Sequence, residues 1–519
     1  MLTARISLVL FLSPHFFIGC DAPREDAVED SQAELRRGSG PLEPGEIQRI
    51  RDAVGASLGT GFATGYSVAV WRDGRVVYKE GFGEKNEGGE AVTPATLFQI
   101  GSDTKKLTAV ALLREVDAGH IGLDDTVGDI DPSLVLAESP DALAHLSIDD
   151  LLSQRSGLFD YTPWFEASDD DELASLVRGR FAENEHAMMP SGIAWSYSNP
   201  NYYLAGYLTE VLDGRAWSDI VTDDVLRPLG MHHTYARRDD MLARESDIAS
   251  GFGLTVDFDT FSLVELLELL LSTDEIGWAE PDEQRDNAMV RPAGLVWSTA
   301  ADQARLLGFF IDGNDCVLSE ELRGDMMSAQ TEVAFLADTI VSAYGYGLFV
   351  DDGYDATDGL HYQVPFVFHG GNTLSMTSES ILLPEQRVAV SVLANGYGEF
   401  LSPVAQVALE AAAGARLPAP TPAQPDFEPP AEDLQVYAGT YHDRNLGEVT
   451  ITWDTDHLAI DIPLLTGAGF EVGPTLEPVA LDQFDLTLEG GPLRIVFHDG
   501  TDGTPRRYGV DRNFVLTRD

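Results

Sequence analysis

The chain has 519 residues, 44% of them hydrophobic, so it is long enough for more than one domain and for a substantial core. It carries 86 acidic and 33 basic residues, a formal net charge of −53, which disfavours nucleic acid as a partner and would repel an anionic membrane surface. Such a composition fits a saline habitat or a GC-rich genome, and in either case added salt should relieve the self-repulsion.

The N-terminus resembles a signal peptide over residues 1–20. Two apolar runs, 6–12 and 16–18, are interrupted at 13–15 and are too short for a comfortable transmembrane helix. Gly19-Cys20 after the second run resembles a bacterial lipobox, which implies that Cys20 is lipidated. The protein would then be secreted across the inner membrane and lipid-anchored, facing the periplasm or cell exterior. The alternative is an ordinary signal peptide with an incidental Cys20. Residues 21–44 read as a flexible acidic tether.

The next elements lead to the first chemical motif. A helix is predicted over residues 46–59, and two strands, 67–71 and 75–79, flank the two-residue turn Asp73-Gly74. A buried-looking segment, 97–101, then opens a helix from about Ser102 that ends at Gly119. Its start reads Ser102-Asp103-Thr104-Lys105, an S-x-x-K motif in a chain that has only four lysines.

This spacing places Ser102 and Lys105 on one face of a helix. A serine hydroxyl is a poor nucleophile until a base removes its proton, and a desolvated lysine amine can act as that base. The backbone N–H of Ser102 would lie at the positive end of the helix dipole, where a developing oxyanion is stabilised. The alternative is an ordinary helical turn, with Ser102 as its cap and Lys105 as a solvated charge.

Two further motifs follow far downstream. Tyr197-Ser198-Asn199 is a Y-x-N motif, and His369-Gly370-Gly371 is an H-x-G motif. If the first segment is extended, Tyr197 and Asn199 face the same side of the chain. A phenol beside Lys105 could act as a phenolate or as a proton relay. Taken singly, Tyr197 reads as a half-buried aromatic residue and His369 as a core histidine.

In this order, the three motifs resemble those of the serine β-lactamase and penicillin-binding-protein superfamily, most closely its class C, D-alanyl-D-alanine carboxypeptidase and esterase branch. The segment Leu151–Leu158, which includes Gln154, resembles the family's L-L-x-H-x-S-G-L pattern. The resemblance covers about residues 45–415. It implies an α/β fold of the β-lactamase/transpeptidase type: an antiparallel sheet flanked by helices, with an all-α part at about 145–295 and a cleft between them.

The resemblance also implies roles for individual residues. Ser102 would form a covalent acyl-enzyme, and Lys105 and Tyr197 would transfer protons, without the sequence showing which is the general base. Asn199 would bind the lysine and the substrate amide. Gly371 of the third motif and Asn372, the residue after it, would also bind substrate, and the N–H of Asn372 would complete the oxyanion hole.

One departure bears on the substrate. His369 stands where many relatives carry the lysine of a K-T-G motif, and imidazole, with an ordinary pKa of about 6.5, is mostly neutral at about pH 7. Anchoring of a substrate carboxylate is therefore weakened, which ranks an ester or D-amino-acid amide above a β-lactam, with a D-alanyl-D-alanine peptide also open. The alternative from another class is a non-catalytic peptidoglycan- or ligand-binding lipoprotein on the same fold.

The remaining segments complete the predicted organisation. Residues 255–290 contain a run, 261–271, that is apolar nearly all round and predicts a buried helix or a lid over the site. A proline-rich linker at 416–432 precedes alternating strands over 433–519, which predict a small, barrel-like all-β domain. It would pack, shield the cleft or bind a wall polymer. No zinc signature is present, and we expect a small-molecule or peptide substrate with neither metal nor cofactor.

Overall fold

The computed structural model describes residues 40–519, except for 164–165, 171, 185, 255–275, 334–341, 422–430, 445, 489–490, 502 and 511–513. The predicted signal peptide, Cys20, nearly all of the tether, the apolar run 261–271 and most of the proline-rich linker lie outside these residues.

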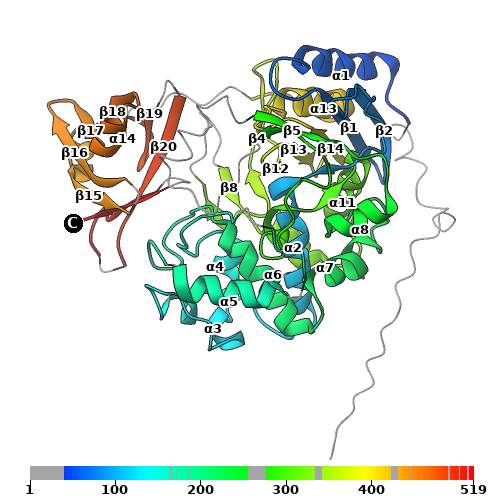
Figure 1. Cartoon of the computed structure of the whole chain (residues 1–519). Helices are drawn as coiled ribbons and strands as arrows, with labels where there is room; N and C mark the ends of the chain where they lie inside the picture. The colour runs from blue at the N-terminus through cyan, green and yellow to red at the C-terminus, as the bar shows by residue number, and fades with distance from the viewer. Residues whose placement is uncertain are drawn as a thin grey trace, which may run out of the picture.

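An eight-stranded antiparallel sheet forms the centre of the larger part of the molecule, with strand order β2-β1-β14-β13-β12-β9-β8-β7 (Figure 1). The predicted hairpin is present, because β1 (Gly65–Arg72) and β2 (Arg75–Gly83) pair across Asp73 and Gly74, both with positive φ. The other strands are β14 (Val388–Ala394), β13 (Thr377–Leu383), β12 (Phe366–Asn372), β9 (Phe349–Asp351), β8 (Ser342–Tyr344) and β7 (Thr331–Glu332).

Helices cover both faces of this sheet, which explains why β1 and β14 are buried along their whole length. On one face, Val68 and Val70 pack with α1 (Pro44–Ser57) and α13 (Ser402–Ala413). On the other face, Ala69 and Trp71 pack with α11 (Ala300–Asp312). The alternation along one strand thus divides the apolar side chains between two layers of core.

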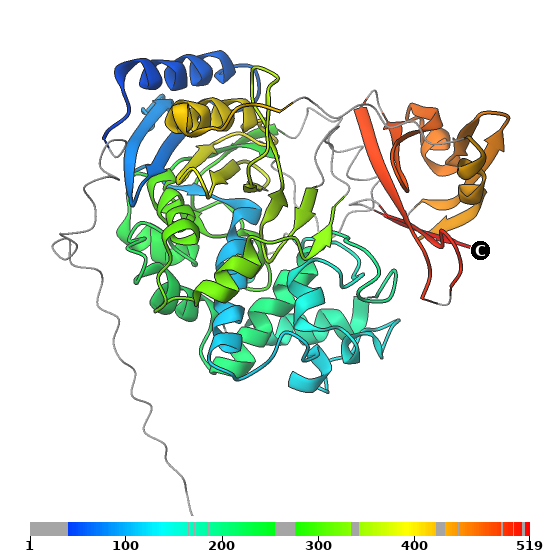
Figure 2. The ribbon, with the colours of Figure 1, turned by 180° about the vertical axis from the view of Figure 1, so that it is seen from behind.

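A helical region packs against the face that carries α11, and Figure 2 shows it from behind. Its main helix is α6 (Asn199–Asp213), which contacts α2 (Lys105–Asp117), a helix buried almost all round. The other helices of the described residues up to 326 are α3 (Val127–Ile130), α4 (Ile148–Leu152), α5 (Glu172–Asn184), α7 (Trp217–Ile220), the π-helical turn Val221–Leu226, α8 (Arg238–Arg244), α10 (Arg291–Gly294) and α12 (Glu320–Met326).

Three short strand pairs connect these layers. They are β3 (Phe98–Gln99) with β6 (Trp297–Ser298), β4 (Gly251–Leu254) with β5 (Ile276–Ala279), and β10 (Tyr354–Asp355) with β11 (His361–Tyr362). β4 and β5 fall within the part at about 145–295 that the sequence predicts as all-α, so that prediction is wrong for these two strands. The pairing of β5 with β4 supplies backbone partners that local propensity does not reveal.

The C-terminal residues form a closed eight-stranded antiparallel barrel, drawn orange to red in Figure 1. Its strands are β15 (Gly439–Asp443), β16 (Gly447–Asp454), β17 (His457–Asp461), β18 (Val472–Ala480), β19 (Gln483–Leu488), β20 (Gly491–His498), β21 (Tyr508–Val510) and β22 (Val515–Arg518), with a short helix α14 (Pro463–Ala468). The expected α/β fold with an all-β C-terminal domain is therefore confirmed. β18 escaped sequence analysis because two prolines and a glycine break its alternation.

The barrel packs directly on the segment that leads to the Y-x-N motif. Met189 and Ala194 form a small apolar cluster with Tyr508, Val510 and Val515 of the barrel. In the described part of the chain, no helix combines the length and the apolar character needed to span a bilayer.

Candidate active site

Ser102 lies in a single 3-10 turn, Gly101–Thr104, that leads directly into α2. Gly101 has a φ of +53°, and a Cβ there would lie 2.6 Å from the backbone nitrogen of Asn372. A Cβ on Gly371 would lie 2.7 Å from the backbone nitrogen of Ser102. Two glycines thus allow the turn and the end of β12 to touch. This contact brings the N–H groups of Ser102 and Asn372 into one neighbourhood, the pair that an oxyanion hole requires.

Lys105 is completely buried beside Ser102. Its Nζ lies 3.0 Å from Ser102 Oγ, 2.7 Å from Asn199 Oδ1 and 2.9 Å from the carbonyl oxygen of Ala293. The amide oxygen and the carbonyl accept hydrogen bonds only, so Lys105 donates to both. A neutral amine has two hydrogens and a lone pair, and in that form its lone pair remains to accept the hydroxyl proton of Ser102.

Asn199 begins α6 and is held on three sides. Its backbone nitrogen donates to Asp160 Oδ1 at 2.7 Å, and its Nδ2 donates to Thr162 Oγ1 at 3.1 Å. Because Nδ2 is engaged by Thr162, the side-chain oxygen is the atom turned to Lys105. The sequence analysis named Asn199 but gave no reason to name Asp160 or Thr162.

Tyr197 lies just before α6 in an extended segment, with only 3% of its surface exposed. Its ring centroid is 4.9 Å from Lys105 Nζ. Gln154 holds both flanks of this residue, since its backbone oxygen accepts from Ser196 N at 2.8 Å and its Oε1 accepts from Ser198 N at 2.9 Å. Gln154 is fully buried and has a φ of +63°. It was visible in the sequence as part of the family pattern, but its contact with the tyrosine segment was not.

His369 lies on β12, in the wall of the same cavity, and is 2% exposed. Its Nδ1 is 2.6 Å from the carbonyl oxygen of Gly370, so Nδ1 donates. Nε2 lies 3.3 Å from the hydroxyl of Tyr344 and, in the neutral imidazole, accepts from it. In a neutral imidazole, each of the two ring nitrogens therefore has a hydrogen-bond partner within the protein.

A cavity of about 360 Å³ joins these groups. All of Ser102, Tyr197, Asn199, His369, Gly371 and Asn372 line it, so the structure brings together the residues that the three motifs nominate, with Lys105 directly beneath. Sequence analysis did not nominate the other lining residues, because none of them is a fixed position of a motif. These are Trp195, Phe349, Phe368, Gly370, Thr377, Ser378, Glu379, Glu399, Phe400, Leu401 and Ser402.

A buried ion pair lies immediately behind Ser102. Lys106 Nζ is 2.7 Å from Asp103 Oδ1, and both side chains are completely inaccessible. Ser380 of β13 donates to the second carboxylate oxygen at 2.7 Å. Burial lowers the pKa of Lys106, and the negative charge of Asp103 opposes that shift.

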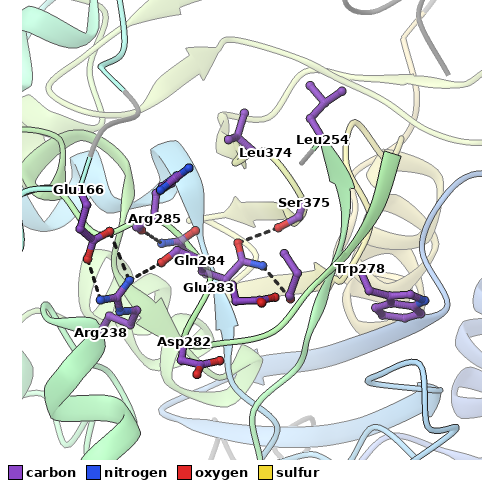
Figure 3. Close-up of a pocket in the computed structure, with 12 residues that line it drawn as sticks. Glu166, Arg238, Leu254, Trp278, Asp282, Glu283, Gln284, Arg285, Leu374 and Ser375 are labelled. Carbon is purple, nitrogen blue, oxygen red and sulfur yellow. Dashed lines mark hydrogen bonds and ion pairs between the residues drawn. The ribbon is translucent and has the colours of Figure 1, made fainter. Parts of the chain in front are cut away.

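A second cavity, of about 560 Å³, contains none of the residues that the motifs nominate (Figure 3). Its polar groups largely satisfy one another. Arg238 pairs with Glu166 at 2.7 Å, and Ser375 donates to Gln284 Oε1 at 2.8 Å. Within the described residues, no group of three or more His, Cys, Asp or Glu is arranged to hold a metal ion.

Comparisons with known proteins agree with this geometry. The family profile described as beta-lactamase matches residues 50–414. Penicillin-binding protein 4 of Amycolatopsis lactamdurans is 28% identical over 73% of this chain and 92% of its own length. The unguisins hydrolase ungD' of Aspergillus campestris is 26% identical over 89% of each chain. The crystal structure of SurE with D-Leu has the same fold, with a TM-score of 0.64 and 21% identity over 92% of this chain and all of that one. The profile covers most of the sequence, and the chain therefore belongs to the beta-lactamase family of serine hydrolases.

Proposed function

We propose that this protein hydrolyses an ester or amide bond through a covalent acyl-enzyme on Ser102. The contact between Lys105 Nζ and Ser102 Oγ, at 3.0 Å, is the observation that carries the proposal. Lys105 is completely buried, and Asn199 Oδ1 and the Ala293 carbonyl oxygen are acceptors that a neutral amine can satisfy. The lone pair is then directed to the nucleophile.

The reaction follows from these positions. Ser102 Oγ attacks the substrate carbonyl carbon while its proton moves to Lys105 Nζ. The N–H groups of Ser102 and Asn372 donate to the oxyanion. Collapse breaks the bond to the leaving group, which takes a proton from the Tyr197 hydroxyl or from Lys105. Water then attacks the acyl carbon, loses a proton to the same pair, and Ser102 Oγ is released with its proton restored.

An active-site label tests the nucleophile. A fluorophosphonate should modify Ser102, and peptide mapping should find the adduct on that residue. Ser102→Ala should lose both the label and turnover. Equal labelling of the variant would contradict the assignment of Ser102, and an absence of labelling and of turnover on every substrate would favour a non-catalytic binding protein.

For the substrate, we rank a short-chain ester or a D-amino-acid amide above a β-lactam. The residues described as lining the cavity include two glutamates and no lysine or arginine, and His369 is satisfied as a neutral ring. A substrate carboxylate would find no permanent cation there. One relative is named as a hydrolase of unguisins, and SurE was solved with D-Leu, which supports amide and D-amino-acid substrates without fixing either.

A panel of esters, D-amino-acid amides, D-alanyl-D-alanine peptides and β-lactams measures this ranking directly. His369→Lys should raise kcat/KM for the carboxylate-bearing members at neutral pH relative to the neutral esters. An unchanged preference would show that position 369 does not anchor a carboxylate.

We also propose that lipidation of Cys20 holds the catalytic body on a membrane. Each acyl chain adds about 0.8 kcal/mol per buried CH₂, enough for two or three chains to outweigh electrostatic repulsion. Cys20→Ser should move the protein from the membrane fraction to the soluble fraction. Normal processing and membrane recovery of that variant would contradict the proposal.

A further inference from the structure

Glu379 contributes a carboxylate to this cavity and has no role in the acyl transfer proposed above. Glu379 of β13 is paired with Gly370 of β12, and a Cβ on Gly370 would lie 3.2 Å from Glu379 Oε2. The carboxylate therefore covers the glycine next to Gly371, whose own contact is with the backbone of Ser102. Glu379 and Ser102 line the same cavity of about 360 Å³ from opposite faces of β13, since Ser378 and Ser380, on either side of Glu379, bond to Ile100 and Asp103 on the Ser102 side.

Aromatic rings lie near this carboxylate. Phe368 is two residues before Gly370 on β12, so it points to the same side of the sheet as Gly370 and its partner Glu379. Phe349 stacks on Phe368 with ring centroids 5.1 Å apart, and Trp195 lies 6.1 Å from Phe349. All three rings line the cavity. Phe400, at its α13 end, is 77% exposed.

Among the residues that the structure describes, no ion pair is found for Glu379, and the cation that acts on it, Lys106, is paired with Asp103. Burial and the negative charge of Asp103 raise the pKa of Glu379 to about 8, and Lys106, which is bonded to Asp103, lowers it only in part. The neighbouring Glu399 accepts hydrogen bonds from Ala63 N at 2.6 Å and from the Tyr66 hydroxyl at 3.0 Å. On β12, His369 has both ring nitrogens engaged.

A carboxylate beside aromatic faces is the arrangement that binds an organic ammonium ion. A cationic ligand would supply the missing counter-charge to Glu379, and its alkyl groups would contact the rings. We propose that this cavity selects substrates that carry a cationic ammonium group, held by Glu379 and the aromatic wall formed by Trp195, Phe349 and Phe368. This inference rests on the proposed hydrolysis at Ser102 and names the substrate class for it.

Three acetate esters of matched size test the selection: acetylcholine, the uncharged 3,3-dimethylbutyl acetate, and the anionic 4-acetoxybutanoate. The fixed charge of choline does not titrate, and the proton transfers of Lys105 and Tyr197 act on all three esters, so ratios of kcat/KM isolate recognition. The cationic ester should exceed the neutral ester by about tenfold, the combined size of a cation–π contact and a carboxylate attraction. That ratio should rise as the pH passes through about 8, where Glu379 ionises.

Glu379→Gln should reduce the ratio towards one and remove its pH dependence. Glu87→Gln, an exposed change of the same charge, is the matched control and should leave the ratio as it is. It separates local recognition from the general attraction of a cation to a chain of net charge −53. Rescue of the ratio by Glu379→Asp would distinguish a charge effect from a merely structural one.

The outcomes separate this inference from the proposed function. If Ser102 is acylated by the neutral ester and the ratio stays near one at every pH, hydrolysis stands and the ammonium preference is wrong. A preference for 4-acetoxybutanoate would overturn it equally.

If no ester is turned over, calorimetric titration of the Ser102→Ala variant with choline still tests for the ammonium site. Binding that Glu379→Gln abolishes would support an ammonium site in a non-catalytic protein. No binding would overturn it.

Discussion

Two regions that share a single helical turn, the Ser102 cavity and the ion pair behind it, use the same residue types for opposite purposes. Lys105 and Lys106 are adjacent in sequence and both completely buried. Lys105 contacts a hydroxyl, an amide oxygen and a carbonyl, whereas Lys106 contacts the carboxylate of Asp103. Burial disfavours the charged form of any amine, whereas a bonded carboxylate opposes that shift, as Asp103 does for Lys106. Reactivity at this turn is therefore decided by the partners and not by burial.

The largest expected effect comes from the first of the two lysines. Lys105→Met removes the amine while keeping the shape of an apolar stem, and turnover of a reactive ester should fall by about 10⁴-fold or more, as expected when one member of a catalytic unit is lost. Steady-state kinetics measures the loss, and circular dichroism checks that the fold remains. Turnover within tenfold of wild type would exclude Lys105 as the base.

Lys106→Met should instead act on stability. It leaves the buried Asp103 without its partner, which costs about 3–5 kcal/mol of unfolding free energy. The double variant Asp103→Asn/Lys106→Met removes the stranded charge and should recover part of that loss in urea denaturation. A single variant as stable as wild type would show that the pair is not needed for folding.

Glu379 gives a third test, in which the direction of the change in stability with pH is fixed in advance. Its pKa of about 8 in the folded protein is above the ordinary value of 4.5, so the unfolded chain releases this proton first and stability falls as pH rises from about 4.5 to 8. Glu379→Gln should therefore raise the unfolding free energy above pH 8 by roughly 2 kcal/mol, less than the full shift because Glu379 keeps part of its surface exposed. At pH 4 the two proteins should be alike, and Glu87→Gln should show no comparable gain.

Gln154 tests how the tyrosine side of the cavity is held. Gln154→Met removes the acceptor for Ser198 N but keeps the backbone bond to Ser196, which should cost about 1–2 kcal/mol of stability. Misplacement of Tyr197 should lower kcat more than it changes KM. A loss of stability with unchanged kcat would mean that Gln154 supports the fold alone.

The smallest expected effect is the salt dependence of the melting temperature, which distinguishes surface charges from the buried ion pair. In a protein lacking residues 1–41, the melting temperature should rise by a few degrees as salt increases from about 0.01 to 1 M, because the Debye length shrinks from about 30 to 3 Å. The stability difference between wild type and Lys106→Met should hardly change with salt, since that pair is inaccessible. A flat or falling melting temperature would contradict the self-repulsion of the acidic surface.

Motif spacing nominated residues that line one cavity, and several of them lie at element boundaries that the sequence marks. Ser102 precedes a helix of strong propensity, and Asn199 opens another with proline at its start. The predicted limits of the S-x-x-K helix differ only in that its first turn, with Ser102, is 3-10 rather than α-helical. The Asp73-Gly74 turn was likewise explicit, since both residues tolerate positive φ. β5, by contrast, was misread, because its partner lies more than twenty residues earlier and only pairing identifies it.

By itself, the sequence determined the class of fold, the order of the three motifs and the types of group available for acyl transfer. Only the tertiary structure decided which groups surround the Lys105 amine, which groups hold Tyr197 and Asn199, and that Glu379 shares their cavity. The physical reason is that local spacing fixes which side chains lie on one face of an element. The partners that set the charge of a buried group come from elements distant in the chain, and their approach depends on glycines such as Gly101 and Gly371, where any larger side chain would keep the backbones apart.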